Sequence, residues 1–459
     1  MNNKQKKIAI LIPDGIGVRN YLYSKVFKGI ENNCVLLHNF NEQALNIIVN
    51  ESKITQNKVL SKYKETIIEK FFRELIHLSR LKWNEKQVDN VTILTNYNPK
   101  KNNLKNKLFY GSIELISSLF SDYDKISWLE KEYIKILKKN VNYELIKNQL
   151  IDLKPEVLIC THQRATNAPL VFLIAKELKI KSYSVIYSWD NLPKARMALR
   201  ADNYLVWSEY MKKELMLFYP EIHQNQIKVT GSPQFEFSEN KNNIIPKDEF
   251  YKTYNLDFNK KNICYSANDL TSPNEVLYLQ DLIDNLTENN AFDKYQLLLR
   301  INPADLSGRF NELLEENKDV IKNVSPKWIN TDRENWANNI PTLIDVKLLT
   351  STCFHSDIAI NLGSTMVFDF SVFNKPSLYI NYNKKENLKF DVNIAYNFQH
   401  FRSMPNKSSV GWVNSKDDFY NIIENVLNQN TSVNAKEWFN MIVKDYKNAS
   451  SNIQKELLS

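Results

Sequence analysis

The chain has 459 residues, with 60 Lys and Arg against 52 Asp and Glu and a formal net charge of +8. Its 43% hydrophobic and 12% aromatic content excludes an intrinsically disordered chain. No stretch approaches the roughly 18 uncharged apolar residues of a membrane-spanning helix. This length is enough for two or three domains, and the rarity of glycine, 8 residues in all, makes each one a candidate for a turn or a close approach to a ligand.

The motifs of several enzyme classes are missing. The four cysteines, at positions 34, 160, 264 and 353, are far apart and form no C-x-x-C pair, which indicates buried thiols in a reducing cytoplasm. There is no H-E-x-x-H and no Cys/His cluster, so we expect no metal site. The sequence also lacks G-x-S-x-G and a P-loop, which argues against serine hydrolases and P-loop NTPases.

The N-terminal third begins as alternating strand and helix. We expect a strand at 6–13, a helix from the following loop to about residue 29, and a strand at 34–38. Residues 41–153 have an almost continuous helical pattern, which we interpret as a helical insertion. The opening pattern predicts a parallel sheet.

The alternation resumes after the insertion and then repeats beyond a break at Thr230-Gly231-Ser232-Pro233. It predicts an α/β fold with two Rossmann-like domains that face each other across a cleft. The expected domains are an N-terminal one at 1–232 with the insertion at about 41–153, a C-terminal one at 233–432, and a C-terminal helix at 433–459 that packs back on the first. The expected strands lie at 156–160, 182–187, 204–207, 227–229, 262–266, 295–300, 321–324, 358–361 and 377–380, and the expected helices at 166–178, 209–218, 273–289, 307–317, 342–353, 364–373 and 415–428.

The positive charge is concentrated near the N-terminus. Residues 1–150 hold 25 Lys and Arg against 15 Asp and Glu, which accounts for the whole excess. This charge distribution has two interpretations. The lysines lie on solvated faces of helices, or they form a surface that attracts an anionic acceptor or anionic lipid headgroups. No nucleic-acid-binding motif accompanies the charge, so we expect no nucleic-acid partner.

Ligands of open α/β sheets bind beyond the carboxyl ends of the strands, and three such loops of the first domain are polar. One carries Asp14 and lacks the third glycine of G-x-G-x-x-G, because Asn20 stands there. The second carries His162 and the third Asp190. These three residues are candidate general bases, which the sequence does not rank. Further acceptor-binding or cleft-lining candidates are Gly15, Gly17, Arg19, Arg164, Trp189 and Asn191.

In the second domain the polar loops suit a phosphate-bearing ligand. A loop before a helix supplies hydroxyls and an amide where free backbone N–H groups favour a phosphate, although capping of that helix by Ser272 explains the loop as well. A second loop brings Gly363, Ser364 and Thr365 to a helix start, with an acidic residue one turn later that can face ribose hydroxyls. The expected donor-binding residues are Gly231, Ser266, Asn268, Thr271, Ser272, Arg300, Gly363, Ser364, Thr365 and Asp369.

Three segments carry a resemblance to known enzymes: Thr230-Gly-Ser-Pro-Gln-Phe235, Gly363-Ser-Thr-Met366 followed by Asp369, and Asn374-Lys-Pro376. They resemble the GT-B class of glycosyltransferases, in particular the bacterial surface-polysaccharide group related to CDP-glycerol glycerophosphotransferases and non-hydrolysing UDP-N-acetylglucosamine 2-epimerases. The resemblance spans about residues 155–382.

The resemblance implies roles for individual residues. Ser364 and Thr365 would hold the donor diphosphate, Asp369 would meet the ribose, and Arg300 with the Ser266–Ser272 loop would line the nucleotide pocket. One departure is that relatives often have Arg-x-His-Pro where this chain has Arg300-Ile-Asn-Pro303.

The expected function is transfer of a sugar from a nucleotide-sugar co-substrate, UDP- or CMP/CDP-linked, without a metal. The expected acceptor is a glycan or lipid-linked molecule in the synthesis of capsule, lipopolysaccharide or a similar bacterial surface polysaccharide. The expected location is cytoplasmic, with peripheral contact at the anionic inner face of the plasma membrane. The alternatives are a glycerophospho- or polyol-phosphate transferase or a nucleotide-sugar 2-epimerase of the same fold, and a non-catalytic nucleotide-binding scaffold.

Overall fold

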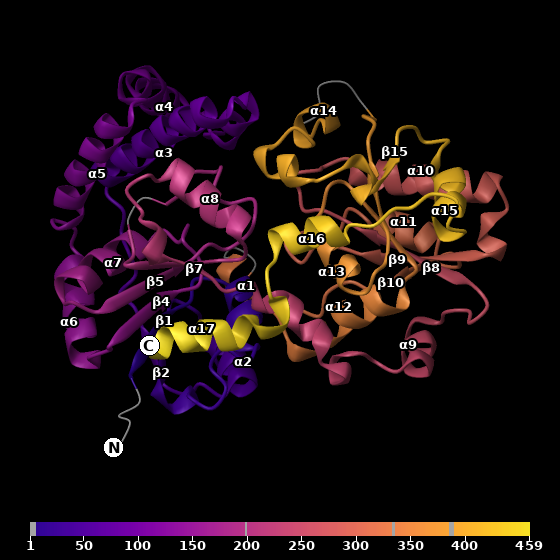
Figure 1. Ribbon diagram of the computed structural model, residues 1–459, viewed down its shortest axis with the longest axis horizontal. Helices are drawn as coiled ribbons and strands as arrows, with labels where there is room; N and C mark the ends of the chain where they lie inside the picture. Colours follow the sequence, from indigo (N-terminus) through magenta and orange to yellow (C-terminus); the bar gives the residue numbers. More distant parts are fainter. Residues whose placement is uncertain (1–5, 198–199, 333–335, 385–389) are drawn as a thin grey trace. The chain divides into compact units, whose positions relative to one another are not determined.

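The computed structural model describes residues 6–197, 200–332, 336–384 and 390–459, and the chain divides into two compact α/β units (Figure 1). Unit 1 comprises the chain up to Gln234 together with Phe398–His400 and Ile442–Ser459, and unit 2 comprises Phe235–Asn397 and Phe401–Met441. Residues 433–441, which we expected to pack with the C-terminal helix on the first domain, belong to unit 2.

Unit 1 is built on a seven-stranded sheet of order β3-β2-β1-β4-β5-β6-β7. Every pairing in it is parallel, and its inner strands are almost entirely buried, as in sheets covered by helices on both faces. The strand order reverses between β1 and β4, which puts the loops after these two strands next to each other. The strands are β1 (Ile8–Leu11), β2 (Cys34–His38), β3 (Asn57–Val59), β4 (Val157–Cys160), β5 (Lys181–Val185), β6 (Asn203–Val206) and β7 (Ile227–Val229).

Two parts of the N-terminal region differ from the expectation. The range 41–153 is not one helical insertion, because β3 lies within it and pairs with β2. Since β3 is a three-residue, exposed edge strand, it has no apolar run by which to be recognised. The helix expected up to residue 29 is the three-residue α1 (Gly15–Gly17) and a π-helical turn, Val18–Leu22.

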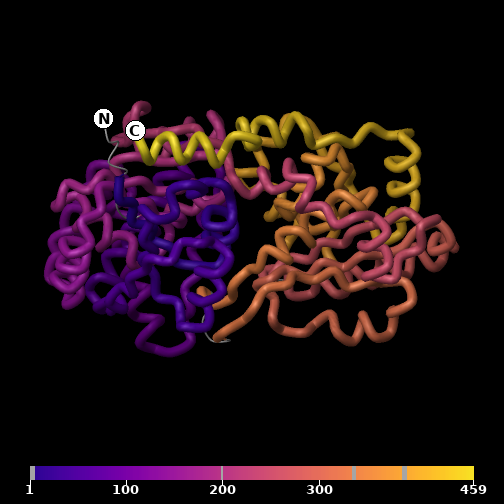
Figure 2. Tube along the Cα trace, turned by 90° about the horizontal axis from the view of Figure 1, so that it is seen from below, coloured from indigo at the N-terminus to yellow at the C-terminus, as the bar shows by residue number. Residues whose placement is uncertain are grey.

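The remaining helices of unit 1 connect its strands or belong to the inserted region, and the last helix of the chain packs beside the sheet. Tyr183 Oη donates to the Glu456 carbonyl at 2.6 Å, which fixes the last helix beside the sheet. Figure 2 shows the end of this helix near the first described residues of the chain, and the Lys6 amine contacts the Ser459 carbonyl. The helices are α2 (Glu42–Ser52), α3 (Ile67–Val88), α4 (Leu104–Ser117), α5 (Tyr123–Leu137), α6 (Tyr143–Leu153), α7 (Ala168–Glu177), α8 (Glu209–Phe218) and α17 (Ala449–Leu458).

Unit 2 has a six-stranded parallel sheet of order β10-β9-β8-β13-β14-β15 and a separate antiparallel pair, β11 with β12. The short strands β11, β12 and β15 were not expected. The strands are β8 (Lys261–Ser266), β9 (Tyr295–Arg300), β10 (Ile321–Asn323), β11 (Ile329–Asn330), β12 (Asn339–Ile340), β13 (Ile358–Asn361), β14 (Ser377–Ile380) and β15 (Gly411–Val413). The helices are α9 (Lys247–Tyr254), α10 (Glu275–Glu288), α11 (Asn311–Glu316), α12 (Leu343–His355), α13 (Met366–Val372), α14 (Val392–Ala395), α15 (Phe419–Leu427) and α16 (Lys436–Ile442).

Two kinds of feature are absent from the described residues. None of the helices there combines the length and apolar character needed to cross a bilayer. In the same residues, no group of three or more His, Cys, Asp and Glu side chains is placed to hold a metal ion.

Candidate functional site

A histidine–aspartate pair lies at the carboxyl end of the unit 1 sheet. Asp14 follows β1 and His162 follows the neighbouring β4. One carboxylate oxygen of Asp14 accepts the Gly17 N–H at 2.9 Å and caps α1, and the other accepts from His162 Nδ1 at 2.6 Å. A carboxylate only accepts, so Nδ1 donates the proton of this hydrogen bond, and in the neutral form of an imidazole with this tautomer the lone pair lies on Nε2.

Packing fixes the orientation of this imidazole. The ring stacks on Tyr187, with centroids 4.0 Å apart and planes 16° from parallel. Gly17 makes the close approach of α1 to β4 possible, because a Cβ there would lie 2.5 Å from Thr161 Oγ1. Within the described part of the chain, His162 Nε2 has no hydrogen-bond partner. The arrangement is that of a general base held by a carboxylate.

Asp190 has a different environment and is not a free base. It is ion-paired with Lys194 and accepts from Asn191 Nδ2 at 2.8 Å. Burial alone raises the pKa of Asp190, but Lys194 and then His400 outweigh it and hold this pKa below its usual value. A carboxylate so stabilised is a poor proton acceptor, and the structure therefore ranks His162 above Asp190.

The other sequence-predicted residues of unit 1 lie around this end of the sheet or in its packing. Trp189 is buried, with its ring edge-on to His400 at 4.6 Å. Asn191 Oδ1 accepts from Gln163 Nε2 at 3.1 Å, which ties the loops after β4 and β5 together. Arg19 Nε donates to Asn20 at 3.0 Å. Gly15 is a buried residue of α1, and burial lowers the pKa of Arg164 while Asp190 opposes this effect.

Gly231 has a structural explanation within unit 1. Its φ is +79°, and a Cβ at this position would overlap the Lys444 carbonyl oxygen. The close approach of the C-terminal segment therefore requires glycine here. Its expected place in a donor site finds no support in these contacts.

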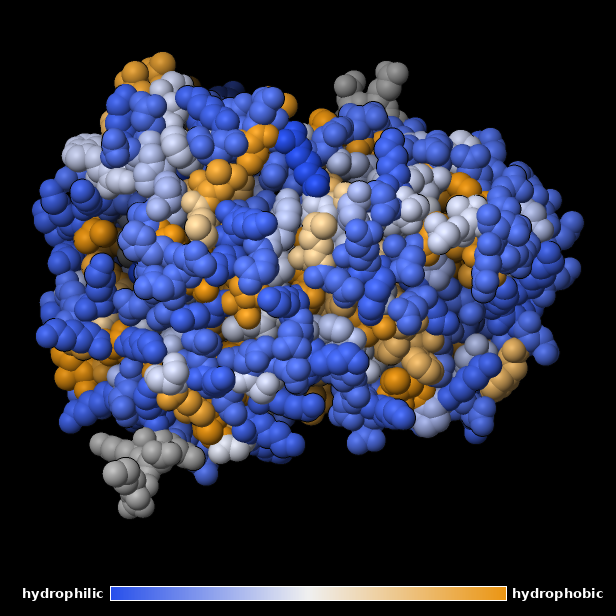
Figure 3. All heavy atoms as spheres, viewed as in Figure 1, coloured by the Kyte–Doolittle hydropathy of each residue, from blue (hydrophilic) through white to orange (hydrophobic). Residues whose placement is uncertain are grey.

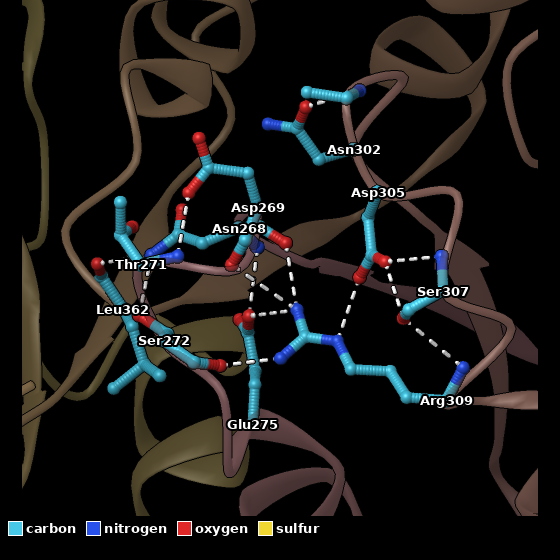
Figure 4. A network of polar contacts seen from close by, with 11 residues as sticks. Asn268, Asp269, Thr271, Ser272, Glu275, Asn302, Asp305, Ser307, Arg309 and Leu362 are labelled. Atoms are coloured by element: carbon cyan, nitrogen blue, oxygen red, sulfur yellow. Dashed lines mark hydrogen bonds and ion pairs between the residues drawn. The ribbon is translucent and has the colours of Figure 1, made fainter. Parts of the chain in front are cut away.

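In unit 2, the loop after β8 is held by Arg309, as Figure 4 shows. The guanidinium donates to the carbonyls of Asn268 (2.9 Å), Asp269 (3.3 Å) and Ser272, and pairs with Asp305 at 2.6 Å. Glu275, fully buried, lies 3.4 Å from the same guanidinium and accepts the Asn268 N–H at 2.8 Å. Sequence analysis missed Arg309, since nothing local indicates three carbonyls from another loop as its partners.

The same network corrects one alternative. Ser272 does not cap α10, because the cap position is Asn274 and no side chain caps it. Ser272 and Ser266 are buried, whereas Thr271 is exposed. The side-chain oxygen of Asn302 accepts the Ala304 N–H at 2.9 Å and stabilises its own turn.

Asn268 connects this loop to the loop after β13. Its Nδ2 donates to the Leu362 carbonyl at 2.9 Å. Gly363 follows with φ +72°, and a Cβ there would come within 3.1 Å of the Tyr396 and Phe401 rings. Asn361 Oδ1 accepts the Ser364 N–H at 2.8 Å. The two loops expected to bind the donor thus meet at the carboxyl ends of the neighbouring strands β8 and β13.

Two donor candidates have other partners. Arg300 is buried and ion-paired with Asp345 (3.1 Å), and its Nη1 donates to the Val324 carbonyl at 3.2 Å. The guanidinium is thus already neutralised inside the unit, and its expected role at the nucleotide stays a prediction. Asp369 lies on α13, and its charge adds to burial in raising the pKa of the Cys353 thiol on α12. Thr365 directly precedes α13.

A cavity of about 620 Å³ in unit 2 was not predicted. Tyr396 and Phe401, the two rings that face Gly363, form part of its wall, so it adjoins the loop after β13. The density of aromatic residues between 390 and 412 is the only sequence signal for it. Its lining consists of Asn381, Tyr396, Phe401, Met404, Pro405, Asn406, Lys407, Trp412 and Asn414.

Comparison with known proteins gives one partial family match. The model of the monogalactosyldiacylglycerol (MGDG) synthase family matches residues 105–233, from α4 to just beyond β7. The match therefore includes helices of the insertion. No curated protein matches the chain by sequence.

Solved structures are similar over nearly the whole chain. UDP-GlcNAc 2-epimerase from Methanocaldococcus jannaschii is 12% identical, with a TM-score of 0.53, and the match covers 98% of this chain and 99% of that one. The Neisseria meningitidis enzyme bound to UDP-GlcNAc is 11% identical (TM-score 0.52; 98% and 99% covered), and S. aureus MnaA in a structure with UDP is 10% identical (0.50; 97% and 94%). The chain has the fold of these proteins. The resemblance to GT-B enzymes and 2-epimerases, stated from sequence motifs, is confirmed at the level of the fold.

Proposed function

We propose that the protein is a nucleotide-sugar-dependent glycosyltransferase in which His162 is the general base. The observation that carries the proposal is the His162–Asp14 pair at the carboxyl end of the unit 1 sheet, with Nε2 buried and without a hydrogen-bond partner among the described residues. The partial match to the MGDG synthase family, whose name denotes a sugar-transferring enzyme, supports transfer to an acceptor.

In the proposed reaction, Nε2 of His162 takes the proton of an acceptor hydroxyl while that oxygen attacks the anomeric carbon of the donor sugar. The bond from the anomeric carbon to the diphosphate oxygen breaks, and the nucleoside diphosphate leaves with the electron pair. Asp14 stabilises the imidazolium that forms. A single displacement of this kind inverts the configuration at the anomeric carbon.

We place the donor on the two connected loops of unit 2. Ser266, Asn268, Thr271 and Ser272 come from the loop after β8, and Gly363, Ser364, Thr365 and Asp369 from the loop and helix after β13. The 2.9 Å bond from Asn268 to the Leu362 carbonyl supports a common site. Backbone N–H groups and hydroxyls at such loops stabilise a diphosphate without a metal. UDP is the first candidate nucleotide, because solved structures of this fold contain UDP or UDP-GlcNAc.

We place the acceptor on unit 1 and propose a glycan or lipid-linked molecule of bacterial surface-polysaccharide synthesis, including capsule and lipopolysaccharide. The matched family makes a galactolipid, as its name states. The excess of Lys and Arg in residues 1–150 suits an anionic surface. Action at the cytoplasmic face of the membrane is part of this proposal.

A 2-epimerase is the second candidate, because the similar solved structures include several UDP-GlcNAc 2-epimerases. A thermal-shift screen with UDP, CDP, CMP and GDP first identifies the nucleotide. Incubation with the matching nucleotide sugar, with and without a lipid extract as acceptor, then separates the two functions. Acceptor-dependent release of nucleotide supports the transferase, and an epimerised nucleotide sugar without acceptor supports the epimerase. A glycerophospho- or polyol-phosphate transferase predicts release of CMP from a CDP-linked polyol instead.

A further inference from the structure

The outer face of α4 carries an apolar stripe. Leu104, Leu108, Leu115 and Leu119 are 66–78% exposed. Their spacing of four, seven and four residues puts them on one side of the helix and of the short 3-10 turn that continues it. The opposite side of α4 carries its buried residues, Tyr110, Ile113 and Ser117. Figure 3 shows apolar surface gathered at the upper edge of unit 1, in the area of α4.

Charge and aromatic residues frame this stripe. Lys105 and Lys107 are exposed and lie on its two flanks. From Tyr97 to Ser121 there are four lysines and a single carboxylate, Glu114, which is ion-paired with Lys101 at 2.7 Å. Beyond the stripe, Phe120 stacks on the half-exposed Trp128 of α5, with centroids 5.9 Å apart. Trp at the border of an apolar surface is typical of a membrane interface.

We propose that the α4 stripe, defined as Leu104, Leu108, Leu115 and Leu119 with Lys105 and Lys107, docks the protein on an anionic lipid surface. The inference deepens the proposed lipid-linked acceptor and rests on that proposed function. Leucines of an interfacial helix enter the headgroup boundary while flanking lysines remain among the headgroups. A lipid with negative headgroups complements both features.

A second copy of the chain is a poorer occupant. A two-fold contact through the same face with parallel helices would place the lysines of one copy close to the lysines of the other. α4 is well supported for docking, because α3 packs against both α4 and α5 (Figure 1). The helix therefore presents the stripe on a firm base.

The test is cosedimentation of the full chain with vesicles. Vesicles with equal amounts of phosphatidylglycerol and phosphatidylcholine are compared with vesicles of pure phosphatidylcholine. Each is tested at about 0.05 M and about 0.5 M salt, because the electrostatic screening length falls severalfold between these concentrations. We expect binding to the anionic vesicles that weakens with salt. A triple variant, Leu104→Gln, Leu108→Gln and Leu115→Gln, is expected to lose at least about tenfold in apparent affinity, in line with the apolar area withdrawn. Lys105→Gln with Lys107→Gln is expected to weaken binding and its salt dependence.

The matched control is Val141→Gln with Leu145→Gln, two apolar residues of the same insertion that are also more than half exposed. It is expected to bind vesicles like the unchanged protein. Equal binding by the triple variant, equal loss in the control, or a change of oligomeric state in place of vesicle binding overturns the inference. All five altered leucine and valine sites are exposed, and circular dichroism checks that each variant folds. Retained UDP binding with no vesicle binding would reject the docking surface and leave the proposed transferase standing.

Discussion

Replacing Asp14 by Asn tests how the His162 ring is held. The two carboxylate oxygens have separate partners, the Gly17 N–H at 2.9 Å and His162 Nδ1 at 2.6 Å. An amide has a single oxygen. If that oxygen keeps the helix cap, the NH₂ group faces Nδ1, which must then accept, and the ring proton moves to Nε2. The base would hold its proton where the acceptor hydroxyl must donate one.

Loss of a general base lowers turnover by about 10²–10⁴-fold, or about 3–5 kcal/mol of transition-state stabilisation. We expect this fall for Asp14→Asn and for His162→Gln, with no further loss in the double variant, since both act through one proton. The assay is acceptor-dependent nucleotide release, with donor binding followed by calorimetry as the control. Asp190→Asn serves as a comparison, because it is expected to lower the stability of the protein and to leave the pH dependence of turnover as in the unchanged protein. Turnover of Asp14→Asn within threefold of the unchanged protein, with fold and donor binding intact, would refute the assignment.

Three further predictions concern stability. Burial raises the pKa of Glu275 to about 8, so the folded state keeps a proton that the unfolded chain releases near the ordinary pKa of a glutamate. Chemical denaturation should therefore show that the free energy of unfolding falls between about pH 5 and 8, and that it falls less for Glu275→Gln. The same pH dependence in both proteins would contradict this. Arg309→Ala leaves the buried Asp305 carboxylate without its cation and should cost about 3–5 kcal/mol, as measured by urea unfolding. A loss under about 1 kcal/mol would show that the network is dispensable. Gly231→Ala should destabilise the protein by at least about 1 kcal/mol because residue 231 has a positive φ. Gly111→Ala, at an α4 position with open space around it, should stabilise the protein by up to about 1 kcal/mol. A change of the same sign in the free energy of unfolding for both variants would contradict the structure.

Most strands of the two sheets could be predicted because they are short, largely buried runs. β4, β9 and β13 are examples, each wholly buried and followed by a loop with charged or amide side chains. β3 escaped prediction because an exposed edge strand needs no apolar side chains. Phe398–His400 belongs to unit 1 although it lies between segments of unit 2, and local sequence contains no signal for such a return.

The loops of the site could be predicted but the partners of their side chains could not. Asp14 and His162 were both candidates, yet their contact spans 148 residues and follows from the adjacency of β1 and β4. Arg300 looked like an open cation at a strand end, because its partner Asp345 is 45 residues away on another element. Which side chains meet across a parallel sheet depends on the order of its strands, and the sequence of a single segment does not determine that order.

Sugar transfer that depends on the His162–Asp14 pair can be measured directly. The most direct measurement follows a radiolabelled sugar from the nucleotide identified by binding, in the presence of a bacterial lipid extract, for the unchanged protein and for His162→Gln. We expect label to move into the lipid-linked fraction with one nucleoside diphosphate released per transfer, and His162→Gln to bind the donor but transfer at least about 100-fold more slowly. Label that remains in the nucleotide-sugar fraction, or transfer by His162→Gln at the unchanged rate, would contradict it.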